Sequence, residues 1–153
     1  MKRINPEYIK AIVETGNDCP YFRLLSMSIK SLGEGSSVLE IDLAEKHLQP
    51  YGMVHGGVFS SIIDAAAYWA VFTEVDENKG LTTIEMKLNY LAPAQKGRIL
   101  AKGRRIKMGK NMGLAEATVT DEHGKLLSHG TATFLITPHL EYGLGKVTVP
   151  KYI

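Results

Sequence analysis

Hydrophobic and polar positions follow two different periods along this chain, and these periods predict its elements. Residues 58–72 are apolar on every side of a helix, with four alanines among them. A helix that is apolar all round belongs inside a protein. Elsewhere apolar and polar residues alternate, which is typical of strands with one buried face. The predicted strands cover residues 22–32, 36–44, 81–91, 98–108, 111–120 and 126–137.

The third of these segments, residues 81–91, is the first after the apolar helix in the sequence and alternates most regularly. Its apolar face is predicted to carry Ile84, Met86, Leu88 and Tyr90. Turn residues separate the strands, including Gly33-Glu34-Gly35 and Gly109-Lys110-Asn111. Asn5, Pro6 and Glu7 have the features of a helix start, so a short helix is expected over 6–15, ended by Gly16.

One helix that must be buried and about six half-buried strands predict an α+β protein. The curved antiparallel sheet of about six strands wraps around the long helix, because this buries both. We expect one domain over 1–153, with the N-terminal helix at about 6–15, the core at about 22–137 and a tail of unassigned role at 138–153. An open sheet edge favours pairing with a second copy, hence a homodimer.

Composition excludes several classes of protein. With 153 residues, 44% hydrophobic and 22% charged, the chain is long and apolar enough for a real core. A net charge of +2 gives no basis for a nucleic-acid partner. The run at 58–72 is too short to span a membrane, and the basic N-terminus is not followed by the apolar core of a signal peptide. A single cysteine, Cys19, fits a reducing compartment, so a cytoplasmic protein is expected.

Candidate chemistry is concentrated at the start of the apolar helix. Asp64 is the one charged residue of the run, and an isolated carboxylate in apolar surroundings is costly. Gly56 and Gly57 stand at the helix N-terminus, where unpaired N–H groups stabilise a developing oxyanion. Asp64 is suited to act as a general base for water or as a nucleophile. Nine residues of helix rise about 13 Å, so His55 and Asp64 of one chain cannot touch one carbonyl. If both act, the site must combine His55 and Gly56 of one subunit with Asp64 of the other.

These residues carry a resemblance. The segment His47-Leu48-Gln49-Pro50-Tyr51-Gly52-Met53-Val54-His55-Gly56-Gly57, followed by Asp64, resembles the motif of the hotdog-fold acyl-CoA thioesterases, in particular their phenylacetate-pathway (PaaI-like) branch. The strand TTIEMKLNYLAPA is similar to the strand that follows in that family. The resemblance covers about residues 38–136 and implies hydrolysis of a thioester to a carboxylate and free CoA. It implies no metal and no cofactor beyond the CoA of the substrate, and a homodimer that pairs into a dimer of dimers.

Carried over by position, the resemblance implies a role for each residue. The Gly56 N–H is the main oxyanion donor, His55 orients or polarises the thioester, and the partner's Asp64 is base or nucleophile. Thr83 falls where relatives hold the attacking water, although it lies on the polar parity of its strand. Gln49 replaces the usual asparagine and keeps the amide.

Substrate binding is assigned to Gly57 and to a basic cluster around the turn at Gly109. That cluster could meet the phosphates of the substrate or be a solvated hairpin; it comprises Arg104, Arg105, Lys107 and Lys110. The helix aromatics could hold the acyl group or belong to the core. His47 and His55 lack the spacing of a metal site. Two other functions are compatible with the fold: a non-catalytic acyl-CoA-binding protein, and a hydratase or dehydratase.

Overall fold

A computed structural model describes residues 2–138 and 147–153 of the chain. Within these two ranges, three α-helices and one short 3₁₀ helix precede or separate six strands. The helices are α1 (Pro6–Asn17), α2 (Pro20–Leu25), η1 (Glu45–His47) and α3 (Gly56–Phe72). The strands are β1 (Met27–Gly33), β2 (Ser36–Asp42), β3 (Lys79–Tyr90), β4 (Arg98–Met108), β5 (Met112–Asp121) and β6 (Leu126–Pro138).

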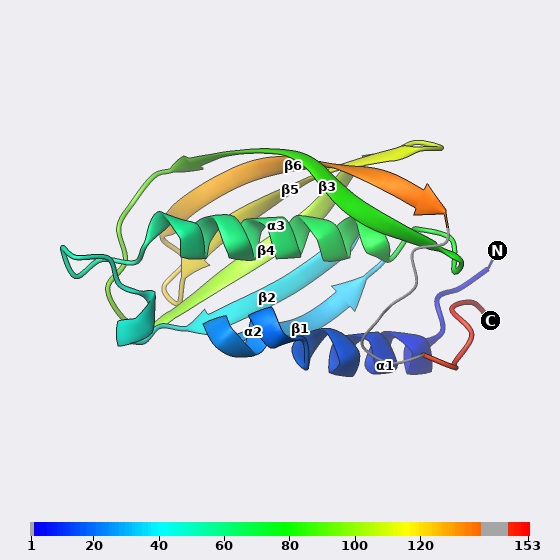
Figure 1. Ribbon diagram of the computed structural model, residues 1–153, viewed down its shortest axis with the longest axis horizontal. Helices are drawn as coiled ribbons and strands as arrows, with labels where there is room; N and C mark the ends of the chain where they lie inside the picture. Colours follow the sequence, from blue (N-terminus) through cyan, green and yellow to red (C-terminus); the bar gives the residue numbers. More distant parts are fainter. Residues whose placement is uncertain (1, 139–146) are drawn as a thin grey trace.

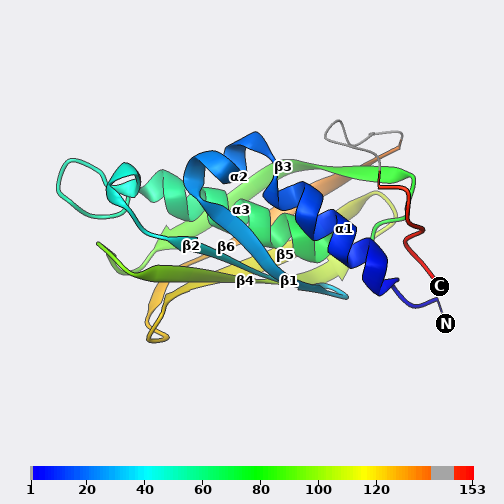
Figure 2. The ribbon, with the colours of Figure 1, turned by 90° about the horizontal axis from the view of Figure 1, so that it is seen from below.

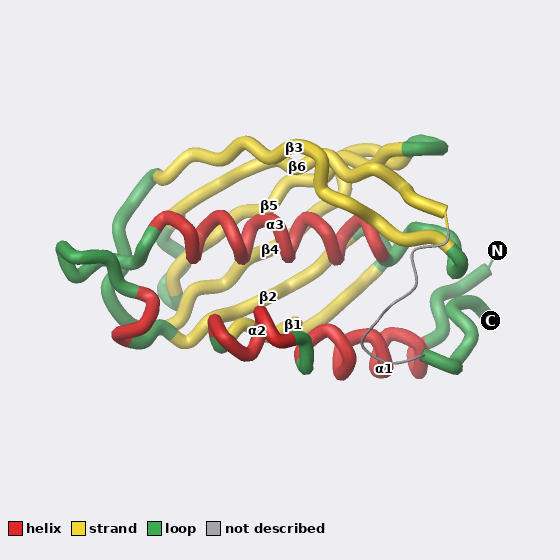
Figure 3. Tube along the Cα trace, in the orientation of Figure 1, coloured by secondary structure: helices red, strands yellow, loops and turns green. Residues whose placement is uncertain are grey.

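The strands form one sheet in the order β1-β2-β4-β5-β6-β3, and every neighbouring pair is antiparallel. The sheet curves around α3, which lies along its concave face (Figures 1 and 3). The predicted architecture, an antiparallel sheet of about six strands wrapped around a long central helix, is confirmed. Ten of the seventeen residues of α3 are buried, as its apolar sequence requires.

Close contact between α3 and the sheet depends on small residues in the strands. A methyl group at Gly103 of β4 would lie 2.1 Å from the carbonyl oxygen of Ala66. The same carbonyl accepts a hydrogen bond of 2.6 Å from the hydroxyl of Ser37 on β2. The helix backbone therefore rests directly on the sheet, and only glycine fits at position 103.

Two expectations for the N-terminal region are wrong. The strand predicted from residue 22 begins only at Met27, because Pro20 starts a helix that ends at Ser26, in the left-handed conformation (φ 53°). Gly16 does not end the first helix but lies inside α1, which runs on to Asn17. Its lack of a side chain has a packing reason: a methyl group there would lie 2.8 Å from the ring of Trp69.

The face predicted for Ile84 is also wrong. A bulge between Thr83 and Glu85 shifts the register of β3 against β6. Ile84 is therefore 52% exposed, whereas Met86 and Leu88 beyond the bulge keep the inward face. The extra residue reverses the parity of the strand before it, so Thr83 points toward α3.

The two edges of the sheet differ. Helices α1 and α2 contact β1 at one edge (Figure 2). At the other edge, no described residue pairs with the outer side of the twelve-residue strand β3. Of the predicted tail, residues 139–146 lie outside the described residues, and the last residues return to the N-terminus through a bridge between Ile4 and Tyr152.

Candidate active site

The N-terminus of α3 leaves one backbone donor free. His55 is the N-cap residue, and its Nδ1 accepts a hydrogen bond of 2.8 Å from the N–H of Gly57. This bond places the imidazole hydrogen on Nε2, which belongs to an exposed side chain. Within the described part of the chain, nothing accepts a hydrogen bond from the N–H of Gly56. Of the two glycines, Gly56 therefore offers the anion-binding N–H, while that of Gly57 is already occupied.

Asp64 lies two turns further along α3 and faces the open edge strand. The hydroxyl of Thr83 on β3 donates a hydrogen bond of 2.9 Å to its Oδ1. Burial raises the pKa of the Asp64 carboxyl, and the bond from Thr83 offsets part of that rise. A carboxylate with a raised pKa is a stronger base, and a neighbouring hydroxyl orients it. The bulge at Thr83 makes this contact possible, since regular alternation would turn Thr83 away.

The segment that precedes the helix is built on His47, a fully buried residue. Its Nδ1 accepts from the N–H of Ala44 at 2.9 Å, so Nε2 carries the hydrogen and donates to the carbonyl of Leu25 at 2.7 Å. Its own carbonyl accepts from the N–H of His55 at 2.8 Å. Both ring nitrogens are thus used, and His47 holds the loop that presents His55.

Gln49 belongs to a tight turn in the same loop. Its Oε1 accepts a hydrogen bond from the backbone N–H of Tyr51, and its carbonyl accepts from Gly52, whose φ is +77°. The oxygen of the amide that Gln49 keeps in place of the usual asparagine is therefore engaged within its own turn. The amide nitrogen remains as the donor that Gln49 can offer.

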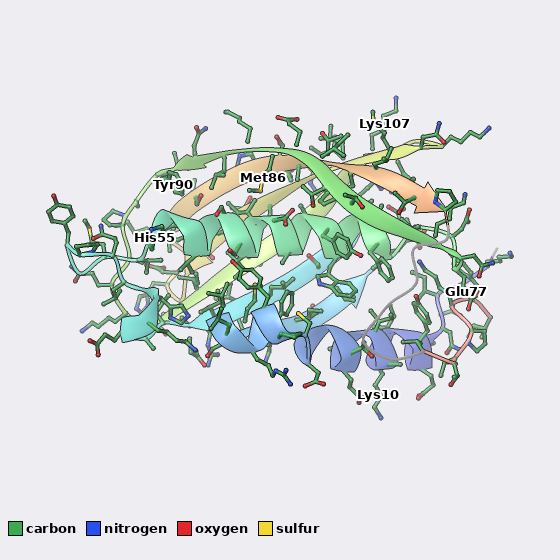
Figure 4. All side chains as sticks on the ribbon, in the orientation of Figure 1. Lys10, His55, Glu77, Met86, Tyr90 and Lys107 are labelled. Atoms are coloured by element: carbon green, nitrogen blue, oxygen red, sulfur yellow. The ribbon has the colours of Figure 1, made fainter. Side chains whose placement is uncertain are left out.

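Tyr90 also lies at this site. The sequence pattern predicted it on the apolar face of its strand but did not identify it as a site residue. A methyl group at Gly56 would come within 3.1 Å of Cε1, Cζ and the hydroxyl oxygen of Tyr90. Figure 4 shows Tyr90 and His55 at the same end of α3. Its inward direction follows from strand alternation, but the meeting with Gly56, 34 positions earlier, depends on the tertiary fold.

The basic cluster around the β4–β5 turn divides into three parts. Arg104 forms an ion pair with Glu116. The Glu116 carboxylate also accepts a hydrogen bond of 2.9 Å from Nε2 of His129. Arg105 forms a two-pronged pair with Glu74, beyond the end of α3, at 2.6 and 2.9 Å. Both arginines are thus neutralised within the protomer.

The two lysines of the cluster are arranged differently. Lys107 and Lys110 line a pocket of about 500 Å³ at the tip of the hairpin, together with Met112, Leu114 and Thr133. This pocket lies near the C-terminal end of α3, because Gly113 packs against Val71. Figure 4 shows Lys107 and His55 toward opposite ends of the molecule.

Two features of residues 2–138 and 147–153 concern metal ligands and membrane-spanning helices. No group of three histidine, cysteine or acidic side chains in these ranges is arranged to hold a metal ion. None of the described helices is long and apolar enough to cross a membrane.

Fold and site together define a class. The helix is buried in a curved antiparallel sheet, has a free N–H at its start and carries a carboxylate of raised pKa two turns later. These features are typical of a hotdog-fold hydrolase of activated carbonyl compounds.

Comparison with known proteins agrees with this class. Residues 51–128 match the model of the thioesterase superfamily. The 1,4-dihydroxy-2-naphthoyl-CoA hydrolase of Listeria monocytogenes is 30% identical over 73% of this chain and 91% of its own length. Two solved structures share the fold. The thioesterase HI1161 of Haemophilus influenzae has a TM-score of 0.80 at 21% identity, covering 88% of this chain and 94% of its own. The phenylacetic acid degradation protein PaaI of Thermus thermophilus has a TM-score of 0.70 at 22% identity, covering 76% and 98%.

The chain belongs to the thioesterase superfamily. The expected hotdog fold and the expected activity, hydrolysis of a thioester, are confirmed.

Proposed function

We propose that this protein hydrolyses acyl-CoA thioesters at a site shared by two protomers. The observation that carries this proposal is the pairing of a free N–H at Gly56 with the Thr83-oriented carboxylate of Asp64 on one helix. Eight residues of helix separate the two groups by about 12 Å. One thioester carbonyl cannot bridge that distance, so the Gly56 of one protomer works with the partner's Asp64.

The reaction uses these groups in order. The thioester oxygen accepts a hydrogen bond from the Gly56 N–H, and His55 donates from Nε2 to the bound substrate. The partner's Asp64 takes a proton from water as the water oxygen attacks the carbonyl carbon. Negative charge then builds on the carbonyl oxygen beside Gly56, where the helix N-terminus stabilises it. Collapse of this intermediate breaks the carbon–sulfur bond, and the CoA thiolate takes the proton from Asp64.

This mechanism needs no metal and no cofactor besides the CoA that the substrate carries, because a base and backbone donors supply both proton transfer and charge stabilisation. Activity is expected to be unchanged after treatment with a chelator and dialysis. The reducing compartment suggested by the lone Cys19 fits a cytoplasmic enzyme.

The open edge of β3 provides the surface for the dimer. Antiparallel pairing of two β3 strands about a two-fold axis joins the two sheets and sets the two α3 helices antiparallel. The end of β3 that carries Tyr90 then approaches the part of the partner strand that carries Thr83. Gly56 and the partner's Asp64 are brought to the same cleft by this pairing. Two such dimers can associate further into a tetramer.

The hairpin pocket suits the nucleotide end of CoA. Within one protomer the pocket lies near the C-terminal end of α3, far from Gly56 at the N-terminal end. Antiparallel α3 helices in the dimer bring the partner's pocket toward Gly56. Its two lysines, Lys107 and Lys110, are exposed and form no ion pair with any residue in 2–138 or 147–153, in contrast to Arg104 and Arg105. They can therefore meet phosphate groups, whereas the arginines serve the fold.

A panel of acyl-CoA esters with a thiol reagent tests the activity directly. Wild-type protein is expected to release free CoA, and Asp64→Asn to lower kcat by at least about a hundredfold because the base is lost. Near-wild-type turnover by Asp64→Asn would remove the carboxylate from the mechanism. Absence of thiol release across the panel by the wild type, with tight binding retained, would identify a non-catalytic acyl-CoA-binding protein instead.

Mixed dimers test the shared site. Gly56→Pro removes the backbone donor at a helix position that accepts proline, and Asp64→Asn removes the base. Each variant alone is expected to be inactive. When both are co-expressed at equal levels, about one quarter of the sites combine an intact Gly56 with an intact Asp64, so about a quarter of wild-type activity returns. No recovery would mean that both groups act within one protomer.

A further inference from the structure

The hydroxyl-bearing end of the Tyr90 ring, not the middle of the ring, lies closest to the N-terminal end of α3. The three Tyr90 atoms nearest to a methyl group built on Gly56 are Cε1, Cζ and the hydroxyl oxygen, all at 3.1 Å. A tyrosine that only covered the helix would present the middle of its ring. The polar tip of the residue therefore lies against the side-chain position of Gly56, the residue whose N–H is free.

This position is held from two sides. The ring packs at an angle of 51° on the buried Phe59, with 6.3 Å between centroids. The backbone around Tyr90 is fastened to β6: the hydroxyl of Ser128 donates to the carbonyl of Asn89 at 2.7 Å, and the N–H of Leu91 donates to Leu127 at 2.9 Å. A group fixed in this way is preorganised, as an efficient charge-stabilising donor must be.

The hydroxyl of Tyr90 is also available. It makes no hydrogen bond with any residue in 2–138 or 147–153, and the residue is 59% exposed in the protomer. Another tyrosine near the same helix is engaged: the hydroxyl of Tyr21 donates to Ser61 at 2.6 Å, since the Ser61 hydroxyl itself donates to the carbonyl of Gly57. The Tyr90 hydroxyl thus offers a side-chain O–H next to Gly56 that no residue in 2–138 or 147–153 occupies.

The distances allow one oxygen atom to use both donors. An amide nitrogen lies about 2.5 Å from the β-carbon of its own residue, so the Tyr90 oxygen is at most about 5.6 Å from the Gly56 nitrogen. Two hydrogen bonds of about 2.9 Å span that separation. An oxygen bound to the Gly56 N–H can therefore accept from the Tyr90 hydroxyl as well.

We propose that Tyr90 is a catalytic residue: its hydroxyl is the second hydrogen-bond donor to the thioester oxygen bound by Gly56. As water attacks, the carbonyl oxygen gains negative charge, and both bonds strengthen; when the carbon–sulfur bond breaks, the charge leaves the oxygen and both relax. No proton is transferred to or from Tyr90. The inference rests on the proposed function, and it also explains why position 56 is glycine, since any side chain there would displace the phenol.

Tyr90→Phe tests the hydroxyl while keeping the ring. Loss of a donor that acts mainly in the transition state is expected to lower kcat on acyl-CoA by about 10- to 100-fold and to change KM less than about threefold. Tyr152→Phe, at the opposite end of the molecule, is the matched control and is expected to keep wild-type kcat. An unchanged kcat for Tyr90→Phe would overturn the inference, and so would an effect confined to KM, which would make Tyr90 a binding residue only.

A second background distinguishes a donor from a packing role. Gly56→Ala keeps the backbone N–H but places a methyl group against the phenol, so it is expected to remove the Tyr90 contribution by itself. Tyr90→Phe should then lower kcat by less than about threefold in the Gly56→Ala protein. Equal effects of Tyr90→Phe in both backgrounds would overturn the inference. If Asp64→Asn abolishes thiol release while Tyr90→Phe leaves kcat unchanged, the proposed function stands and only the role of Tyr90 fails.

Discussion

Removal of one hydroxyl should shift the pH dependence of the enzyme. In Thr83→Val the side chain keeps nearly the same shape but no longer donates to Asp64. Burial already raises the pKa of Asp64, and the Thr83 bond is the contribution that lowers it. Without that bond the pKa rises further. A base must be ionised to act, so activity is lost as the pH falls through this pKa, and the variant loses activity at a higher pH than the wild type.

The size of the shift follows from the strength of the bond. Hydrogen bonds to charged groups contribute about 1.5–3 kcal/mol, and one pKa unit corresponds to about 1.4 kcal/mol. Because Asp64 is only partly buried in the protomer, the lower end applies, and we expect the acid limb of the profile to move up by about one pH unit. On the acid limb the variant should be several-fold slower, while at high pH, where Asp64 is ionised in both proteins, the two rates should agree within a few-fold.

The measurement is kcat/KM for thiol release between pH 4 and 9. Thr83→Ser, which keeps a hydroxyl at the same place, is the matched control and should retain the wild-type limb. The reasoning is refuted if the limb of Thr83→Val stays in place or moves to lower pH, or if the loss of rate is the same at every pH. A uniform loss would mean that Thr83 binds the attacking water rather than setting the state of Asp64.

Three further predictions concern stability, each measured by urea or thermal unfolding. Asp64→Asn should raise Tm at pH 7.5 while activity is lost, because a raised pKa means that ionisation of Asp64 destabilises the folded state once the pH exceeds that pKa; an unchanged or lower Tm contradicts this. Gly103→Ala should lower the free energy of unfolding by about 3 kcal/mol or more, since its methyl group meets the Ala66 backbone. Gly16→Ala should lower it by less, since its methyl group meets only side chains; the reverse order would contradict this reasoning. Burial lowers the pKa of Lys151 from 10.5 to about 8, so the unfolded chain binds more protons than the folded chain between these pH values. The unfolding free energy of wild type relative to Lys151→Met should therefore rise above about pH 8 by up to about 1.4 kcal/mol per pH unit. A difference that does not change with pH would refute this.

Lys151 also shows what the sequence could not reveal about the C-terminal segment. Its Nζ donates to the carbonyls of Phe72 and Val75 at the end of α3, 2.8 Å to the former, and the side chain is almost fully buried. A cation at a helix C-terminus interacts favourably with the exposed carbonyls. Nothing in the pattern around Lys151 indicates this role, because its partners lie more than seventy positions away.

The identity and order of the main elements were readable from the chain, because periodicity reports which face of each element meets apolar surroundings. The apolar run at α3 and the alternation from 98 to 137 sufficed for the architecture and for locating Gly56, His55 and Asp64 at one helix. The reading failed where a local backbone event overrode the pattern: Pro20 turned an apolar stretch into α2, and the bulge after Thr83 reversed the faces of β3.

What the sequence determined by itself is a set of elements with their buried faces and the chemistry carried by one helix start. The tertiary structure alone decided which of those groups meet. Thr83 reaches Asp64 through a bulge, Tyr90 reaches Gly56 from a strand 34 positions later, and the cap of His55 leaves one glycine N–H free rather than two. The physical reason is range: hydrophobic periodicity records only whether a residue faces the core, whereas a hydrogen bond is made or lost within a few tenths of an ångström, and that precision exists only after the sheet has closed around the helix.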